Sequence, residues 1–157
     1  MQKDKGQALV ETAIILPLLL IFLFGIVDFG RVMYTKNTLN NAARSGARKA
    51  AVTSSLAAVS PVSLFSSTGE PAETIQKNIF NGIPKDETVQ YELKILDSAG
   101  IPVAGTVSAG NQVQVTLAYP DFPMITPLYK ILALITNSSA PDSNTMTLTG
   151  EASMRYE

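Results

Sequence analysis

An apolar run dominates the first part of the chain. From Gln7 to Val27 only Glu11 is charged, and apolar side chains occur all around the helix that this run would form. At about 1.5 Å per residue, such a helix approaches the roughly 30 Å hydrocarbon core of a bilayer. Because no polar face remains to meet water, the run requires lipid or a dense helical bundle around it. We therefore expect a transmembrane helix over residues 7–28.

Two other interpretations of the run are considered. A buried core helix is disfavoured because this length and uniformity are unusual inside a small domain. A cleaved secretory signal peptide needs a small-residue cleavage site after the apolar stretch. The chain instead continues with Asp28-Phe29-Gly30-Arg31 and then with an amphipathic helical pattern. A retained span is therefore the preferred interpretation.

Two residues are unusual for a simple membrane anchor. Pro17 removes a backbone donor and predicts a kink in the helix. Glu11 places a carboxylate in the run, which costs about 2.5–3.5 kcal/mol at a bilayer centre and less near an end. Glu11 therefore either lies solvated at the headgroup level or awaits a positive partner. Charge does not decide the orientation, because cations flank both sides of the run: Lys3, Lys5, Arg31, Lys36 and Arg44.

The helical pattern continues over residues 29–52, outside the membrane. Apolar and small residues recur there at spacings of three, four or seven: Val32, Leu39, Ala43, Gly46 and Ala50. We expect this face to pack on the protein's own sheet, with close approach of a partner helix as a complementary role. Gly25 and Gly30 are interpreted as helix-packing residues, like Pro17, Ala43, Gly46 and Ala50. The basic residues opposite, Arg44, Arg48 and Lys49 among them, predict a solvated face, with phosphate or lipid binding as the alternative.

Residues 53–157 predict one small α+β domain. The expected elements are a loop (53–69), a short helix from Glu70 to Phe80 ended by Asn81-Gly82, strands at 88–96, 112–119 and 145–156, a short amphipathic helix at 124–135 and a polar loop at 136–144. Pro120 and Pro123 are expected to stop the second strand. The predicted fold class is thus a long N-terminal helix, membrane-spanning in its first half, packed on a small antiparallel sheet in a pilin-like plan.

Composition narrows the possible chemistry. The chain has no cysteine and no histidine, so disulfides, thiolate metal sites and a Ser-His-Asp triad are excluded. A net charge of −1 provides no global basic field for nucleic acid. We expect no cofactor and no metal site, and we favour a non-enzymatic role. A carboxylate-only or Ser-Lys enzyme stays open on composition alone.

The N-terminal residues resemble a known family. A short basic leader (residues 1–6) ends at Gly6, Glu11 is the fifth residue after it, and the apolar run follows at once. This arrangement resembles the cleavage region of type IV-like prepilins. The stretches 8–13, 16–20, 25–31 and 41–48, in this order and spacing, resemble the TadE-like family of minor pilins or pseudopilins of Tad pili. The C-terminal pieces Tyr119-Pro120 and 147–152 are only loosely similar.

The resemblance implies a mechanism. A prepilin peptidase would cut between Gly6 and Gln7 on the cytoplasmic face, and Glu11 would pair with the new N-terminal amine of a neighbouring subunit. The implied partners are this peptidase, other pilin or pseudopilin subunits and the inner-membrane pilus assembly platform. The implied topology is a single-pass protein of the bacterial inner membrane. Its short N-terminus would be cytoplasmic and its C-terminal domain periplasmic, or extracellular once in the pilus.

Two departures and one competing function accompany the resemblance. The leader carries Asp4 among its lysines. Gln7 replaces the aromatic residue found after the cut in major type IV pilins, which leaves N-methylation open. The competing function is a single-span, membrane-anchored envelope domain that binds another partner and is neither cleaved nor polymerised. The identity of the mature N-terminal residue separates these two functions.

Overall fold

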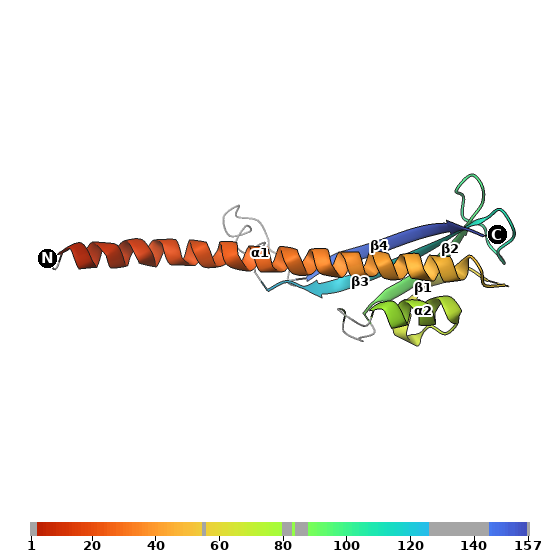
Figure 1. Ribbon diagram of the computed structural model, residues 1–157, viewed down its shortest axis with the longest axis horizontal. Coiled ribbons are helices and arrows are strands. Elements are labelled where there is room, and N and C mark those ends of the chain that lie inside the picture. Colours follow the sequence, from red (N-terminus) through yellow and green to blue (C-terminus); the bar gives the residue numbers. More distant parts are fainter. Residues whose placement is uncertain (1–2, 55, 80–82, 84–87, 126–144, 157) are drawn as a thin grey trace. The chain divides into compact units, whose positions relative to one another are not determined.

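The computed structural model describes residues 3–54, 56–79, 83, 88–125 and 145–156. Its elements are α1 (Lys3–Ala50), β1 (Val59–Ser63), the 3-10 helix η1 (Leu64–Ser66), α2 (Glu70–Ile79), β2 (Gln90–Leu96), β3 (Gln112–Pro123) and β4 (Thr145–Arg155) (Figure 1). A long N-terminal helix and a four-stranded sheet confirm the predicted α+β class. The chain divides into two compact units, residues 1–32 with 123–145 and residues 33–122 with 146–157.

The sheet has the strand order β1-β2-β3-β4. β2 pairs with its neighbours β1 and β3 in antiparallel fashion, and its register with β3 runs from Gln90↔Ala118 to Leu96↔Gln112. Alternate residues of the two central strands are buried, as the period-two pattern predicts: Tyr91, Leu93, Ile95, Val113, Val115, Leu117 and Tyr119. Val89, directly before β2, is buried as well. The sheet therefore contributes one apolar face to the core of the second unit.

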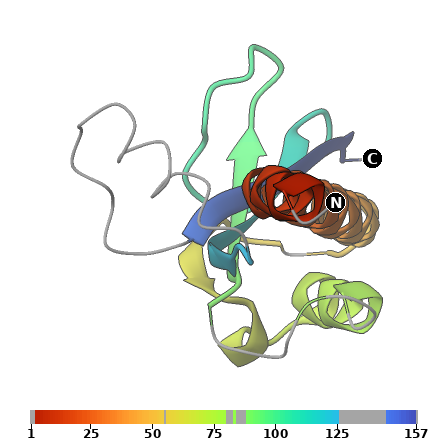
Figure 2. The ribbon, with the colours of Figure 1, turned by 90° about the vertical axis from the view of Figure 1, so that its left-hand side faces the viewer.

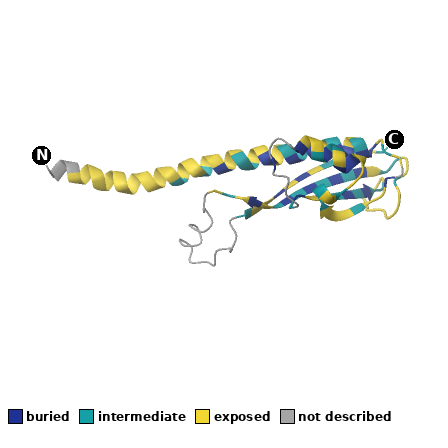
Figure 3. Ribbon diagram, turned by 90° about the horizontal axis from the view of Figure 1, so that it is seen from below, coloured by how far each residue is buried: buried dark blue, intermediate teal, exposed yellow. Residues whose placement is uncertain are grey.

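The part of α1 that belongs to the second unit packs against this core through small residues. Leu39, Ala43, Ala47 and Ala50 have no exposed surface (Figure 3). At Gly150 of β4, an added Cβ would lie only 2.6 Å from the backbone carbon of Leu39. The backbones of α1 and β4 therefore approach more closely than any residue with a side chain would allow.

The helix α2 forms as its sequence predicts. Glu73 donates its N–H to the carbonyl oxygen of Gly69 at 3.0 Å, and the apolar stripe Ala72, Ile75 and Ile79 is buried. The helix lies beside the last turns of α1 (Figure 2), where Gly46 leaves room for Ile75. Its predicted last residue Phe80 and its predicted stop at Asn81-Gly82 lie outside the described residues.

Two expectations about the strands are wrong. β1 lies within the segment expected to be a loop. Its sequence, Val-Ser-Pro-Val-Ser, has no alternating pattern that would predict a strand, and most of the strand is exposed. It forms by pairing with the edge of β2, with an irregularity between Val59 and Val62. β3 also continues past Tyr119 to Pro123 rather than stopping at Pro120.

The extension of β3 has a simple cause. Pairing with β2 ends at Ala118, so the missing N–H of Pro120 interrupts no bond to that strand. The Thr147 hydroxyl of β4 donates to the Pro120 carbonyl oxygen at 3.1 Å, and Phe122 packs edge-on against Tyr119 with ring centroids 5.9 Å apart. A proline can therefore lie within a strand where the neighbouring strand no longer pairs with it.

The last predicted strand is present as β4. Leu148 and Gly150 are buried on its inner face, Ala152 and Met154 are half-buried, and Met146 is exposed. The helix predicted at 124–135 lies outside the described residues from 126 onward, as does the loop predicted at 136–144.

The contact at Gly150 generates a stability prediction. Gly150→Ala should lower the free energy of unfolding by about 1–3 kcal/mol, because the new methyl group meets helix backbone that cannot rotate away. Gly46→Ala should cost less, because the atom it meets is the end of the Ile75 side chain. Thermal unfolding of the full chain in detergent, followed by circular dichroism, measures both. The exposed neighbour variant Thr149→Ala should change stability by no more than about 0.5 kcal/mol. Wild-type stability in Gly150→Ala would contradict the close contact.

Candidate functional site

The first part of α1 is an exposed apolar helix. Large apolar side chains from Leu9 to Phe29 are exposed, for example Leu9 at 72% and Phe22 at 68%. The N-terminal part of α1 is coloured as exposed almost throughout in Figure 3, and soluble monomers rarely expose a contiguous apolar surface of this kind. Among the described residues, α1 is the one helix long and apolar enough to cross a membrane, by length and composition. Because none of its most apolar window is buried, the structure disfavours a soluble core helix here.

The predicted processing residues occupy the start of this helix. Gly6, Gln7 and Glu11 are all exposed, and nothing lies within 4 Å of the position of a Cβ on Gly6. Glu11 follows Gln7 by four residues, which places both on one helix face. Within the described part of the chain, Glu11 has no ion-pair partner. This arrangement leaves its carboxylate accessible to a group from outside the chain.

The predicted packing residues fall into two groups. Pro17 lies inside α1, which continues through it. Gly25 and Gly30 have no atom near the position of a Cβ, and Gly25 opens a shallow apolar pocket of about 390 Å³ that is lined also by Ile21, Phe22, Ile26 and Phe29. The residues Ala43, Gly46 and Ala50, by contrast, are buried within the chain's own second unit. Only the first group is available to a neighbouring helix.

A polar cluster closes the apolar run. Asp28 is almost completely buried, at 1% exposure. One of its carboxylate oxygens, Oδ1, accepts the backbone N–H of Ile125 at 2.9 Å and lies 3.4 Å from the guanidinium of Arg31. The same guanidinium donates to the carbonyl oxygen of Pro123 at 3.2 Å. The side chains of Asp28 and Arg31 thus connect α1 to the backbone at the end of β3, at Pro123 and Ile125.

Sequence reasoning did not assign this role. The sequence pattern places Asp28 at the end of the predicted span and Arg31 among the cations that flank it, and both lie in the family-like stretch 25–31. The partner backbone lies 97 residues further along the chain, so no local spacing points to it. The one local indication is the charge of Asp28 directly after the apolar run, because a carboxylate that is buried there needs a hydrogen-bond donor.

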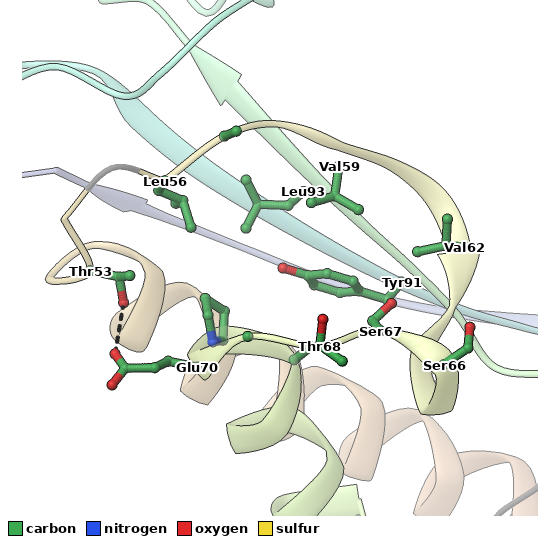
Figure 4. Close-up of a pocket in the computed structure, with 14 residues that line it drawn as sticks. Thr53, Leu56, Val59, Val62, Ser66, Ser67, Thr68, Glu70, Tyr91 and Leu93 are labelled. Atoms are coloured by element: carbon green, nitrogen blue, oxygen red, sulfur yellow. Dashed lines mark hydrogen bonds between the residues drawn. The ribbon is translucent and has the colours of Figure 1, made fainter.

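A second surface feature is a groove in the globular unit (Figure 4). It has a volume of about 480 Å³, its floor is formed by Tyr91 and Leu93, and hydroxyl groups of the segment 66–68 line one side. Burial raises the pKa of the Tyr91 phenol to about 12. At the rim, a hydrogen bond from Lys49, 3.0 Å from the Glu70 carboxylate, lowers the pKa of that carboxyl. No group of three metal-ligating side chains occurs among the residues described.

The Asp28 cluster generates a local prediction. Asp28→Ala should lower the free energy of opening at the Ile125 amide by about 1–3 kcal/mol, because that N–H loses its acceptor. Asp28→Asn keeps an oxygen acceptor and should cost less. Hydrogen–deuterium exchange of the full chain in detergent, read by mass spectrometry on peptides ending near residue 125, measures the change. The exposed acid variant Asp121→Ala serves as the control. Unchanged exchange at Ile125 in Asp28→Ala would rule out the anchoring role.

Comparison with known proteins supports the family interpretation of the N-terminal region. The family model described as TadE-like protein matches residues 6–48, which contain Gly6, Glu11, Asp28 and Arg31. No curated protein and no solved structure matches the chain. The match therefore confirms the predicted resemblance: residues 6–48 match the model of the TadE-like family.

Proposed function

We propose that this protein is a minor pilin or pseudopilin of a Tad-type pilus, inserted in the bacterial inner membrane and processed by a prepilin peptidase. One observation carries the proposal: Gly6 and Glu11 stand at the start of an exposed apolar helix, inside the region that matches the TadE-like family. The short N-terminus is then cytoplasmic, and the globular unit lies outside the cytoplasm. The protein acts through assembly, without a cofactor and without catalysis of its own.

Glu11 receives a specific role in this proposal. A carboxylate brought alone into a low-dielectric helix bundle is penalised, whereas a nearby positive charge offsets that cost. Cleavage after Gly6 creates such a charge at Gln7, and in an assembly the amine of one subunit reaches Glu11 of the next. The exposed, unpaired position of Glu11 among the described residues supports this role.

The apolar pocket at Gly25 supports close packing of neighbouring helices. Without a side chain, Gly25 leaves a depression among Ile21, Phe22 and Phe29 into which an apolar side chain of another helix fits. Association of helices within a membrane depends on such close contacts at small residues. Partners of this kind include other pilin or pseudopilin subunits and the assembly platform in the inner membrane.

The alternative is a membrane-anchored envelope domain that is neither cleaved nor polymerised. The exposed apolar helix alone fits this function equally well, because any anchor needs one. What favours the pilin function is the combination of Gly6 and Glu11 at this spacing, which a simple anchor does not require.

The processing step generates the decisive prediction. In cells that make the pilus, mass spectrometry of the membrane-extracted protein should find Gln7 as the first residue. Gly6→Val should block the cut, because a branched side chain obstructs close approach of the peptidase to the backbone. The matched change Ala13→Val adds similar bulk inside the run and should leave processing intact. A mature chain beginning at Met1 in the wild type would support the simple anchor instead.

The charge at Glu11 generates a second prediction. Glu11→Ala should insert and be processed normally but should be lost from sheared filaments or from complexes with other pilins, because the neighbour's amine loses its counter-ion. Quantitative immunoblotting of sheared and membrane fractions measures the distribution. Thr12→Ala removes an adjacent hydroxyl, bonded only within its helix to the Ala8 carbonyl oxygen, and serves as the control. Wild-type incorporation of Glu11→Ala would exclude the pairing.

A further inference from the structure

The second unit's part of α1 has an exposed face whose charges are all positive. We call this the cationic face and define it by the exposed residues Asn37, Asn41, Arg44 and Arg48, which lie on one side of the helix. Lys36 is also exposed and lies beside this face, seven residues before the buried Ala43. No Asp or Glu occurs between Phe29 and Gly69 in the sequence. Among the described residues, Lys36, Arg44 and Arg48 form no ion pair, although Lys49 pairs with Glu70 and Lys94 pairs with Glu92, each at 3.0 Å. The face is therefore a concentration of uncompensated positive charge.

Its two arginines are arranged unfavourably for an isolated helix. Arg44 and Arg48 are four residues apart, so they lie next to each other on one face and repel. The neighbouring Lys49 cannot compensate them, and its own positive charge already has Glu70 as partner. An anionic partner bridging Arg44 and Arg48 would relieve this repulsion.

A recess beside Arg48, which Arg44 does not line, gives an acidic group next to the arginine pair access to the Arg48 side chain. It has a volume of about 420 Å³ and is lined by Ser45, Arg48, Lys49 and Val52 of the α1 end together with Thr74 and Asn78 of α2. Lys49 pairs with Glu70, and the three other polar side chains of the recess donate within their helices: the Ser45 hydroxyl to the Asn41 carbonyl oxygen, the Thr74 hydroxyl to that of Glu70 and the Asn78 amide to that of Thr74. The guanidinium of Arg48 has no hydrogen-bond partner within the described ranges of the chain, and its planar fork fits a carboxylate with two parallel hydrogen bonds.

The surroundings of the face favour a protein partner. Met33 and Tyr34 are exposed at one end of it, and Arg, Tyr and Met are enriched at protein interfaces. A lipid-binding helix must turn an apolar face toward the bilayer. Here the opposite face is buried against the sheet through Leu39, Ala43 and Ala47. The overall net charge of −1 disfavours a nucleic acid.

We propose that the cationic face docks the acidic surface of a neighbouring pilin-like subunit, with a carboxylate of that subunit seated between Arg44 and Arg48. This proposal rests on the proposed function, because it names the surface through which the globular unit meets its neighbour in the assembly. It is separate from the pairing of Glu11, which concerns the first unit.

The test is site-specific crosslinking of the full chain in cells that make the pilus. A photo-reactive amino acid at Asn41 should crosslink to a pilin-like subunit at a position close to Asp or Glu, and mass spectrometry identifies the adduct. The same probe at exposed Ser153 of β4 should not give this adduct. The double variant Arg44→Glu/Arg48→Glu should lower the adduct yield by about tenfold or more, because like charges then oppose docking. The matched double variant Lys94→Glu/Arg155→Glu should retain it.

Two further measurements make the outcome decisive. Protease resistance of the Arg44→Glu/Arg48→Glu chain in detergent shows that it is folded, and changing the crosslinked acid of the partner to Lys should restore the adduct. An adduct with lipid or nucleic acid, the absence of an adduct, or a yield that charge reversal leaves unchanged would overturn the docking surface. If Gln7 is still the mature N-terminus in those cells, the failure concerns this surface alone. If the chain begins at Met1, the proposed function fails as well.

Discussion

Close contact between the second part of α1 and the sheet is the interaction on which the globular unit depends. It is possible because the buried helix face consists largely of alanine and glycine, and because Gly150 presents bare backbone at the crossing. Small residues bury little area each, so the helix contributes to the core mainly by covering Leu117, Val115 and their neighbours. This packing also decides which residues of the helix are exposed, because side chains too large or too polar for the close contact lie on the outer face. Arg44 and Arg48, which form no ion pair among the described residues, therefore project from a helix whose other face is packed against the sheet.

One continuous helix, α1, has an N-terminal part that is apolar on all sides and a C-terminal part that is amphipathic. Residues before Asp28 expose apolar side chains on all faces, which only lipid or other helices can satisfy. Residues after it separate an apolar from a polar face. Asp28 and Arg31 mark the change, and they use their charges to hold the backbone at Pro123 and Ile125. A buried acid is acceptable there because it has a cation and a backbone N–H as partners, the arrangement that burying a charge requires.

Sequence periodicity predicted most of the fold where its signal was local. The alternation of Tyr91, Leu93 and Ile95, and the helical stripe of Ile75 and Ile79, depend on residues a few positions apart. β1 lacked such a signal, because an exposed edge strand has no face to bury. The extension of β3 through Pro120 depends on where β2 ends, and the role of Asp28 depends on a partner far along the chain. All three belong to tertiary structure, which single-sequence patterns do not record.

For the candidate site, sequence and structure contribute different information. The motif around Gly6 and Glu11 resembles the cleavage region of prepilins, and the processing and pairing proposed from it involve an enzyme and another chain. The structure adds what the motif lacks, namely which residues remain accessible. Ala43 and Gly46 are used within the chain, whereas Gly25 remains open. In the proposed assembly, a neighbouring subunit meets this protein at surfaces that its own core has left free, and the apolar helix and the cationic face are two such surfaces among the described residues.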